Sequence, residues 1–307
     1  MKFIDELKSI VKGNFLENEP MSKHTTYGIG GPAMAYINPK DRFDLSNILK
    51  FSTKNEIPVY FIGTGSNLLV ADNGIEGIVL TPAKSLKQLE IKKNRVVAES
   101  GVMLGKLVKE CIKHNLTGLE SLIGVPGTLG GALVMNAGAF GGEISNFLKS
   151  VDIMTMSGEI NTFSNSDIDF SYRFSSFKKD EFILLARFKL QTEVPEIINH
   201  KKLKASSGRK TNQPLRYRSA GSVFKNHKDY AAGYLIDNAG LKGTKIGDAE
   251  ISTHHANFFI NHGNASASDI SALIRIAREA VLKKFGIELE LEIRTLGFDP
   301  KELEVYV

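Results

Sequence analysis

Glycines gather in three clusters in the first half of this 307-residue chain, and their spacing suits the binding of phosphate groups. The clusters read YGIGGP at 27–32, GTGSN at 63–67 and GVPGTLGG at 124–131. Glycine has no side chain, so its backbone N–H groups can approach a diphosphate closely and form an anion-binding nest. The spacing is not that of a GxGxxG dinucleotide fingerprint, and no GK[ST] of a P-loop occurs. From the residues alone, plain surface loops and an extended dinucleotide-binding site therefore both stay open.

A basic segment between residues 200 and 218 is the second feature that could bind a ligand. The whole chain carries a net charge of only +5, but this segment holds His200, Lys201, Lys202, Lys204, Arg209, Lys210, Arg216 and Arg218. Such a surface suits polyanions and phosphorylated small molecules alike. The chain has no Trp, and it contains no RNA-recognition or zinc-finger pattern, so we do not expect a nucleic acid as the partner.

Cysteine and histidine offer little for metal or thiol chemistry. The single cysteine, Cys111, excludes a disulfide framework and a multi-cysteine metal site within this chain. Cys111 also lies on the apolar face of a predicted helix, which favours a packed thiol over a nucleophile. His254 and His255 are adjacent, and neighbouring side chains of a strand point to opposite faces, so we expect no metal site there.

Short apolar runs and amphipathic stretches predict an α+β fold that would position these residues. Strands are predicted at 35–37, 58–62, 77–80, 95–98, 150–156, 159–163, 182–191 and 288–295. Helices are predicted at 41–55, at 104–112 and at 193–204, where Pro195 suits a first turn. The clearest helix follows a capping box formed by Ser266 and Asp269 and stops at Gly286. Residues 118–142 are too rich in glycine for one regular element.

The composition is that of a globular protein, with 42% hydrophobic and 24% charged residues. The length suggests about two domains. No window approaches 18 uninterrupted apolar residues, so no membrane-spanning helix is expected. The first fifteen residues carry acids and lack an apolar core, unlike a signal peptide, and a cytoplasmic location is therefore expected.

Seven motifs in a fixed order resemble those of the UDP-N-acetylenolpyruvoylglucosamine reductases, the MurB family. The first three contain the glycine clusters: HTTYGIGGPA (24–33), GTGSNLLV (63–70) and GVPGTLGGALVMNAGAFGGE (124–143). The others are SYR (171–173), SAGSVFKN (219–226), GLKGTKIGDAEISTHHANFFIN (240–261) and EIRTLG (292–297). The resemblance spans nearly the whole chain. No inserted loop follows Arg173, so the chain resembles the short form of the family, which lacks an extra tyrosine segment.

The resemblance implies a p-cresol methylhydroxylase-type FAD-binding fold of two subdomains plus a C-terminal α+β substrate domain. The implied boundaries are 1–75 and 76–194 for the FAD-binding subdomains and 195–307 for the substrate domain. The residues implied to hold the diphosphate and ribityl chain of FAD are Gly63, Thr64, Gly65, Ser66, Asn67, Gly124, Val125, Pro126, Gly127, Thr128, Gly130 and Gly131. Asn136, Ala137 and Gly138 are implied to line the isoalloxazine ring.

The implied reaction reduces an enolpyruvyl ether on a UDP-sugar to a lactyl ether, with NADPH as the hydride donor to FAD. Negative charge builds on the substrate carboxylate and its neighbouring carbon, so a fixed cation and a proton donor are required. The resemblance assigns Arg173 to the carboxylate, which a guanidinium can hold by two parallel bonds. It assigns Ser222 as the proton donor and Glu292 as a carboxyl that orients or shares the proton. Without the resemblance, a strand-end arginine, a turn serine and a solvated glutamate would be the ordinary interpretations.

The resemblance also implies substrate contacts by Tyr172, Arg209, Lys225 and Asn226. The chain departs from the family pattern at four positions. Gly28 stands where many relatives carry a basic residue, Arg218 and His227 stand at common proline positions, and His254 replaces a frequent lysine. A monomer is expected.

Two other functions stay open at this point. One is a flavin oxidase of the same cofactor fold that acts on an alcohol or sugar. The other is a nucleotide-binding or RNA-binding protein without catalysis, whose binding to nucleic acid would weaken steeply with salt.

Overall fold

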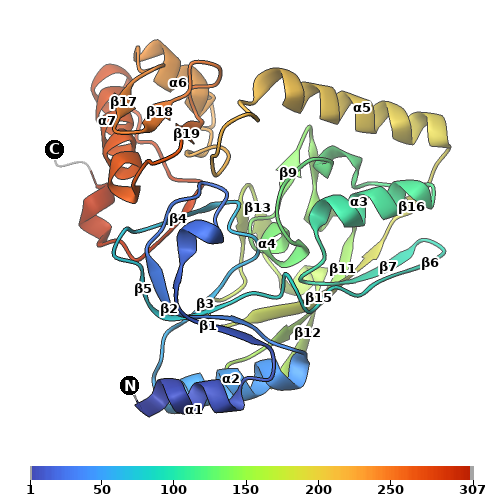
Figure 1. Ribbon diagram of the computed structural model, residues 1–307. Coiled ribbons are helices and arrows are strands. Elements are labelled where there is room, and N and C mark those ends of the chain that lie inside the picture. Colours follow the sequence, from blue (N-terminus) through green and yellow to red (C-terminus); the bar gives the residue numbers. More distant parts are fainter. Residues whose placement is uncertain (1, 305–307) are drawn as a thin grey trace. The chain divides into compact units, whose positions relative to one another are not determined.

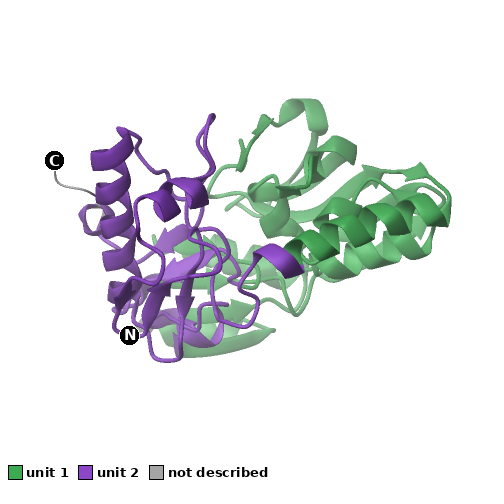
Figure 2. Cartoon of the chain, turned by 90° about the horizontal axis from the view of Figure 1, so that it is seen from above, with its two compact units in different colours: residues 1–17, 35–64, 77–209 green, residues 18–34, 65–76, 210–307 purple. Residues whose placement is uncertain are grey.

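The computed structural model describes residues 2–304, and the chain divides into two compact units (Figure 1). Unit 1 comprises residues 1–17, 35–64 and 77–209, and unit 2 comprises residues 18–34, 65–76 and 210–307 (Figure 2). The GTGSN loop is divided between them after Thr64. The three segments implied by the family resemblance divide the chain at other positions and stay a prediction.

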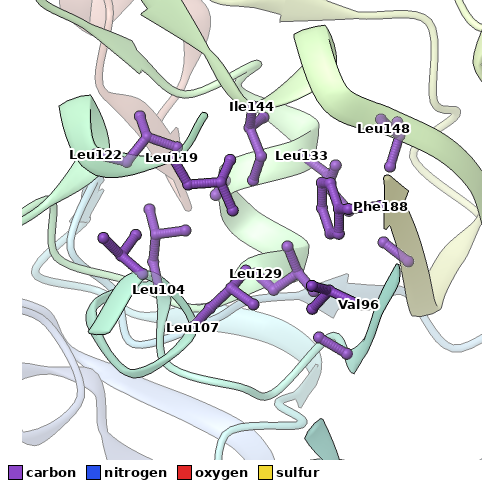
Figure 3. Packing of buried hydrophobic residues seen from close by; sticks show 14 of the residues in the cluster. Val96, Leu104, Leu107, Leu119, Leu122, Leu129, Leu133, Ile144, Leu148 and Phe188 are labelled. Atoms are coloured by element: carbon purple, nitrogen blue, oxygen red, sulfur yellow. The ribbon is translucent and has the colours of Figure 1, made fainter. Parts of the chain in front are cut away.

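Unit 1 is built on a five-stranded antiparallel sheet with the order β12-β11-β15-β7-β6. Its strands are β6 (Leu89–Lys92), β7 (Arg95–Glu99), β11 (Leu148–Met154), β12 (Ile160–Ser164) and β15 (Phe182–Lys189). Helices α3 (Leu104–Lys113) and α4 (Leu129–Val134) bury their apolar residues against this sheet. Figure 3 shows Leu107 and Leu129 of the helices beside Val96 of the sheet. This core fixes the loops that precede and follow α4.

A second sheet has the order β1-β2-β5-β3, in which β3 and β5 run parallel. Its strands are β1 (Asn14–Pro20), β2 (Pro32–Asn38), β3 (Val59–Phe61) and β5 (Ile75–Leu80), and the divisions between the units fall within β1, β2 and β5. Helices α1 (Lys2–Ile10) and α2 (Arg42–Lys54) belong to unit 1. The buried carboxylate of Asp44 in α2 accepts hydrogen bonds from the N–H groups of Lys12, Gly13 and Lys40, so its charge is well satisfied.

Short elements complete unit 1. They pair β8 (Leu116–Thr117) with β16 (Gln191–Thr192), β9 (Gly138–Ala139) with β10 (Gly142–Glu143), and β13 (Phe170–Ser171) with β14 (Phe174–Ser175). Helix α5 (Pro195–Asn212) follows.

In the described part of the chain as a whole, single turns of 3-10 helix lie at Met21–Lys23, Glu120–Leu122, Ile144–Phe147, Asn165–Asp167 and Pro300–Leu303.

Unit 2 packs helix α7 (Ala267–Phe285) and helix α6 (Ala232–Asn238) around a three-stranded sheet of order β17-β18-β19. The strands are β17 (Lys245–Ile246), β18 (Ala249–Ile251) and β19 (Phe259–Asn261). Two further strands, β4 (Leu68–Val70) and β20 (Arg294–Leu296), pair in parallel. Phe224 and Phe259 are fully buried in the core of this unit, with an edge-to-face contact between their rings. Phe224 thereby anchors the SAGSVFKN segment.

The structure confirms most of the predicted elements. The capping box of Ser266 and Asp269 starts α7, and Gly286, with φ +68°, ends it. The apolar stripe of α3 is buried as predicted, and burial raises the pKa of the Cys111 thiol to about 12, which confirms a packed thiol. None of the helices within residues 2–304 is long and apolar enough to cross a membrane.

Two sequence interpretations were wrong. Of the strand predicted at 288–295, only Arg294 and Thr295 belong to a regular ladder, that of β20 (Arg294–Leu296), although Leu289 and Ile293 are buried as the alternation predicts. The neighbouring 222–225 segment is irregular, so only scattered backbone bonds join it to residues 288–293, among them Lys225 N–H to Glu290. His254 and His255 lie in a turn between β18 and β19 and not on a strand, so strand alternation does not decide where they point.

Candidate functional site

The second and third glycine clusters meet in unit 1. A β-carbon at Gly63 would lie 2.5 Å from Thr128 Oγ1, so only glycine fits there without movement. The hydroxyl of Thr81 donates to the carbonyl of Gly63 at 2.9 Å and fixes the same loop. The 127–130 segment pairs with residues 100–104 through backbone bonds, including Gly130 N–H to the Ser100 carbonyl at 2.9 Å. Two segments assigned to FAD are therefore adjacent.

Features of these loops fit a bound dinucleotide. Gly124 and Gly127 have φ of +77° and +121°, which glycine adopts without strain because it has no side chain. The buried hydroxyl of Ser100 and the buried Oδ1 of Asn136 have no hydrogen-bond partner in the described part of the chain. Buried polar atoms normally have a partner, so these two are suited to a ligand group that enters beside the glycine loops.

Asn136 and Arg173 lie together in strained backbone conformations. Asn136 is fully buried with φ +40°, and its amide donates to Glu143 Oε2 at 2.8 Å and to the Ser171 carbonyl at 3.0 Å. Arg173 has φ +57°, its Nη1 donates to the Gly138 carbonyl at 3.1 Å, and its guanidinium lies 4.9 Å from the ring centre of Tyr172. Such conformations persist where surrounding contacts enforce them and are common at functional sites.

Arg209 adds a second guanidinium to this part of unit 1. Its Nε donates to the Ile123 carbonyl at 3.0 Å, and its guanidinium lies 5.8 Å from the ring centre of Phe140. Burial lowers the pKa of Arg209, and the positive charge of Arg173 lowers it further. Two cations that disfavour each other are stabilised by an anion, so Arg173 and Arg209 form a candidate anion site.

In unit 2, the first glycine cluster meets the other half of the GTGSN loop. A β-carbon at Gly65, whose φ is +65°, would overlap the carbonyl oxygen of His24. The N–H of Thr26 donates to the Gly65 carbonyl at 3.2 Å. Two residues on, the amide of Asn67 donates to the Glu292 carbonyl at 3.0 Å. The loop assigned to FAD therefore contacts the backbone of a residue assigned to catalysis.

Backbone pairing also brings Ser222 and Glu292 together within unit 2. The N–H of Glu292 donates to the carbonyl of Val223, the residue after Ser222, at 2.8 Å. Asn257 holds the same loop, because its carbonyl accepts the Val223 N–H at 2.8 Å. Its buried side chain accepts the Phe224 N–H at 2.9 Å and donates to the Phe224 carbonyl at 2.8 Å. Ser222 is half-buried, next to Gly221 with φ +80°.

Lys225 and Asn226 continue this loop. Lys225 Nζ lies 2.5 Å from Glu290 Oε1, and the side-chain carbonyl of Asn226 accepts the Ala232 N–H of α6 at 3.0 Å. Both side chains therefore have partners within unit 2. Of the residues predicted from the sequence, Arg173, Tyr172 and Arg209 belong to unit 1, whereas Ser222, Glu292, Lys225 and Asn226 belong to unit 2.

Comparisons with known proteins decide the family. A family model described as the C-terminal domain of UDP-N-acetylenolpyruvoylglucosamine reductase matches residues 213–296, and one described as an FAD binding domain matches residues 33–164. The UDP-N-acetylenolpyruvoylglucosamine reductase of Clostridium tetani is 42% identical over 299 residues, 97% of each chain. The chain belongs to the UDP-N-acetylenolpyruvoylglucosamine reductase family.

Other members of this reductase family agree with that assignment. The Caldanaerobacter subterraneus reductase is 41% identical and covers 96% of this chain, with 98% of its own length matched. The crystal structure of the Thermus caldophilus enzyme superimposes with a TM-score of 0.80 at 34% identity, over 93% of this chain and 99% of that one. The FAD-binding fold expected from the sequence is thereby confirmed.

Sequence reasoning missed several residues that hold the reductase site together. Asn257 lies inside a matched motif, but a single sequence does not show which backbone groups a buried amide will meet. Glu290, which has no role in the sequence-based prediction, pairs with Lys225 although its side chain stays 72% exposed. Glu143 ends the third glycine motif, and this position was the only signal that it faces Asn136.

Proposed function

We propose that this chain reduces UDP-N-acetylglucosamine enolpyruvate to UDP-N-acetylmuramate, with FAD as its cofactor and NADPH as the reductant, in peptidoglycan precursor synthesis. The relatives that span its full length are named for this reductase activity. The observation that carries the proposal is the backbone pairing of Glu292 with the residue after Ser222, because it holds the segments of the proposed proton donor and the proposed carboxyl residue side by side. The same segment of unit 2 binds the Asn67 amide of the proposed FAD loop.

The glycine loops would hold the flavin. In unit 1 these are Gly63, Thr64 and residues 124–131, with Asn136, Ala137 and Gly138 at the ring, and in unit 2 they are Gly65, Ser66 and Asn67. When bound, reduced FAD supplies a hydride to the terminal enol carbon of the substrate. Every other requirement of the reaction falls on side chains of this chain.

Arg173 binds the substrate carboxylate in this proposal. As the new C–H bond forms at the terminal carbon, negative charge builds on the neighbouring carbon and is shared with the carboxylate. A guanidinium stays charged throughout and stabilises that charge without giving up a proton. The bond from Arg173 to the Gly138 carbonyl fixes its orientation, and Tyr172 supports its face.

Ser222 gives its hydroxyl proton to the carbon that carries this charge, which completes the lactyl ether. A serine hydroxyl is a weak acid, so it must be held close to the basic carbon. Val223 and Phe224, fixed by Asn257, restrict the loop in this way. Glu292 orients or shares the proton, and Arg209, Lys225 and Asn226 bind the anionic part of the UDP-sugar in this proposal.

A few wider proposals depend on the same reaction. UDP-sugars and NADPH are cytoplasmic metabolites, so we place the enzyme in the cytoplasm and expect it to act as a monomer. A role in cell-wall synthesis would make it necessary for cell shape and division. The match of residues 213–296 to a reductase C-terminal domain favours the reductase over a flavin oxidase.

An anaerobic visible spectrum tests the proposal. The purified protein should be yellow, should bleach with NADPH and should recover its colour when the enolpyruvyl UDP-sugar is added. Reoxidation by oxygen alone would favour an oxidase, and a colourless protein that takes up no FAD would refute the flavoenzyme. Ser222→Ala should lose the recovery by substrate and keep the bleaching by NADPH, whereas Ser219→Ala, three residues away, should keep both steps.

A further inference from the structure

We propose that Arg218 is a diphosphate-binding residue of this chain, and that Gly28 is the glycine that makes room for it. The inference rests on the proposed function, because the two ligands of that reaction that could meet Arg218, FAD and the UDP-sugar, each contain a diphosphate. It concerns two residues for which the reaction as derived above has no role.

The Arg218 side chain fills the space that any side chain at position 28 would need. A β-carbon on Gly28 would overlap Nη1 of Arg218 and lie 3.0 Å from its Cδ and 3.1 Å from its Cζ. Gly28 also has φ +67°, a conformation that glycine adopts without strain. The absence of a side chain at position 28 therefore lets the guanidinium lie over the backbone of the first glycine cluster.

Three hydrogen bonds hold the two segments together. The hydroxyl of Thr26 donates to the Ser219 carbonyl at 2.7 Å. The backbone N–H of buried Asn261 donates to the Arg218 carbonyl at 2.9 Å, and the Asn261 amide donates to the Tyr27 carbonyl at 2.9 Å. Because Tyr27 before Gly28, and Arg218 with Ser219 after it, are tied in this way, the placement of the guanidinium follows from the fold of unit 2.

The charge of Arg218 is available to a ligand. Its side chain is exposed, and it forms no ion pair with any carboxylate within residues 2–304. The segment beneath it contacts Gly65 through Thr26, so the cation lies over a segment that is bonded to the loop we assign to FAD. A guanidinium binds phosphate oxygens through two parallel hydrogen bonds, and backbone N–H groups of glycine loops bind the same anion.

Charge removal and charge relocation test this role. Arg218→Met keeps an unbranched apolar side chain at this position and removes the charge. We expect it to weaken the binding of FAD, or of the UDP-sugar, by about tenfold, equivalent to about 1.4 kcal/mol. Adding Gly28→Lys to this variant returns a cation to the same space and should restore most of the lost affinity. Arg216→Met, an exposed arginine two residues away, is the matched control and should bind as the wild type does.

Two titrations separate the ligands. FAD affinity is measured by the quenching of flavin fluorescence on the deflavinated protein, and UDP-sugar affinity by calorimetry on the FAD-loaded protein. A loss for FAD alone assigns Arg218 to the cofactor diphosphate, and a loss for the UDP-sugar alone assigns it to the substrate. If both affinities stay within twofold of wild type, the inference is wrong while the proposed function stands. A wild-type protein that binds neither ligand would instead overturn the proposed function, and this inference with it.

Discussion

Asn257 offers a direct test of how the loop around Ser222 is positioned. Within residues 2–304 its side chain forms hydrogen bonds only to the backbone of Phe224, one accepted at 2.9 Å and one donated at 2.8 Å. Asn257→Ala removes both bonds and leaves the backbone N–H and carbonyl of the fully buried Phe224 without these partners. The variant does not alter Ser222 or Glu292 themselves.

The expected cost follows from those two bonds. A buried polar group that loses its partner costs about 1–3 kcal/mol, so the loss of partners for two groups should cost unit 2 about 2–6 kcal/mol of unfolding free energy. The loop should also relax, and a displacement of about 1 Å in a reacting group can slow a step by about 100-fold. We therefore expect the reoxidation of reduced flavin by substrate to slow by about that factor, and the reduction by NADPH to change little.

Anaerobic stopped-flow absorbance separates the two half-reactions. Asp72→Ala is the control, since Asp72 accepts three hydrogen bonds from Ala267 and Ser268 at the start of α7, and its loss destabilises unit 2 elsewhere. That control should lose stability and keep the rate of reoxidation. If Asn257→Ala and Asp72→Ala slow this step equally, the effect is one of stability and the positioning argument is refuted. The double variant with Ser222→Ala should be no slower than Ser222→Ala alone, because Asn257 acts through Ser222.

Three further outcomes are expected. Gly63→Ala places a methyl group against Thr128 Oγ1 and should reduce FAD affinity by about tenfold, or about 1.4 kcal/mol, as measured by flavin fluorescence. Burial alone would raise the pKa of Asp152, but its bonds from Arg187 and Thr162 outweigh burial and hold that pKa below the usual value. A carboxyl group whose pKa is lowered by folding stabilises the fold at pH values above its unfolded-state pKa, and this stabilisation is lost as the pH falls through its folded-state pKa. Asp152→Asn removes the group, so the urea concentration at the unfolding midpoint should depend less on pH on the acid side. With a thiol pKa of about 12, Cys111 should not react with an aromatic disulfide reagent at pH 8 in the native protein, and it should give one equivalent once unfolded.

Local signals predicted the elements far better than they predicted the site. Ser266, Asp269 and Gly286 mark the two ends of α7 because capping depends on residues within one turn. The strand predicted at 288–295 was wrong for the opposite reason. Alternation tells which side chains are buried, but a ladder also needs a regular partner strand, and the neighbouring 222–225 segment is not one.

The site depends on contacts between residues far apart in the chain. Thr26 meets Ser219, and Asn67 meets Glu292, and neither pairing has a signal in one sequence. The positive φ of Arg173 is equally hidden, since an arginine gives no warning of a left-handed conformation. The family motifs predicted the residues of the site, whereas the residues that hold them in place could be identified only from the three-dimensional structure.

Those supports share one chemical feature, which bears on the reaction. Arg173, Arg209, Asn67, Asn257 and Asn261 each donate a hydrogen bond to a backbone carbonyl. A carbonyl is neutral, so such a bond orients a guanidinium without cancelling its charge, whereas a carboxylate partner would do both. The Arg209 cation can then be held in place and still attract the diphosphate of a substrate. The same arrangement makes the loop backbone part of the binding machinery. A substitution that moves a carbonyl, such as one at Gly138 or Ile123, should therefore impair anion binding as much as the loss of an arginine.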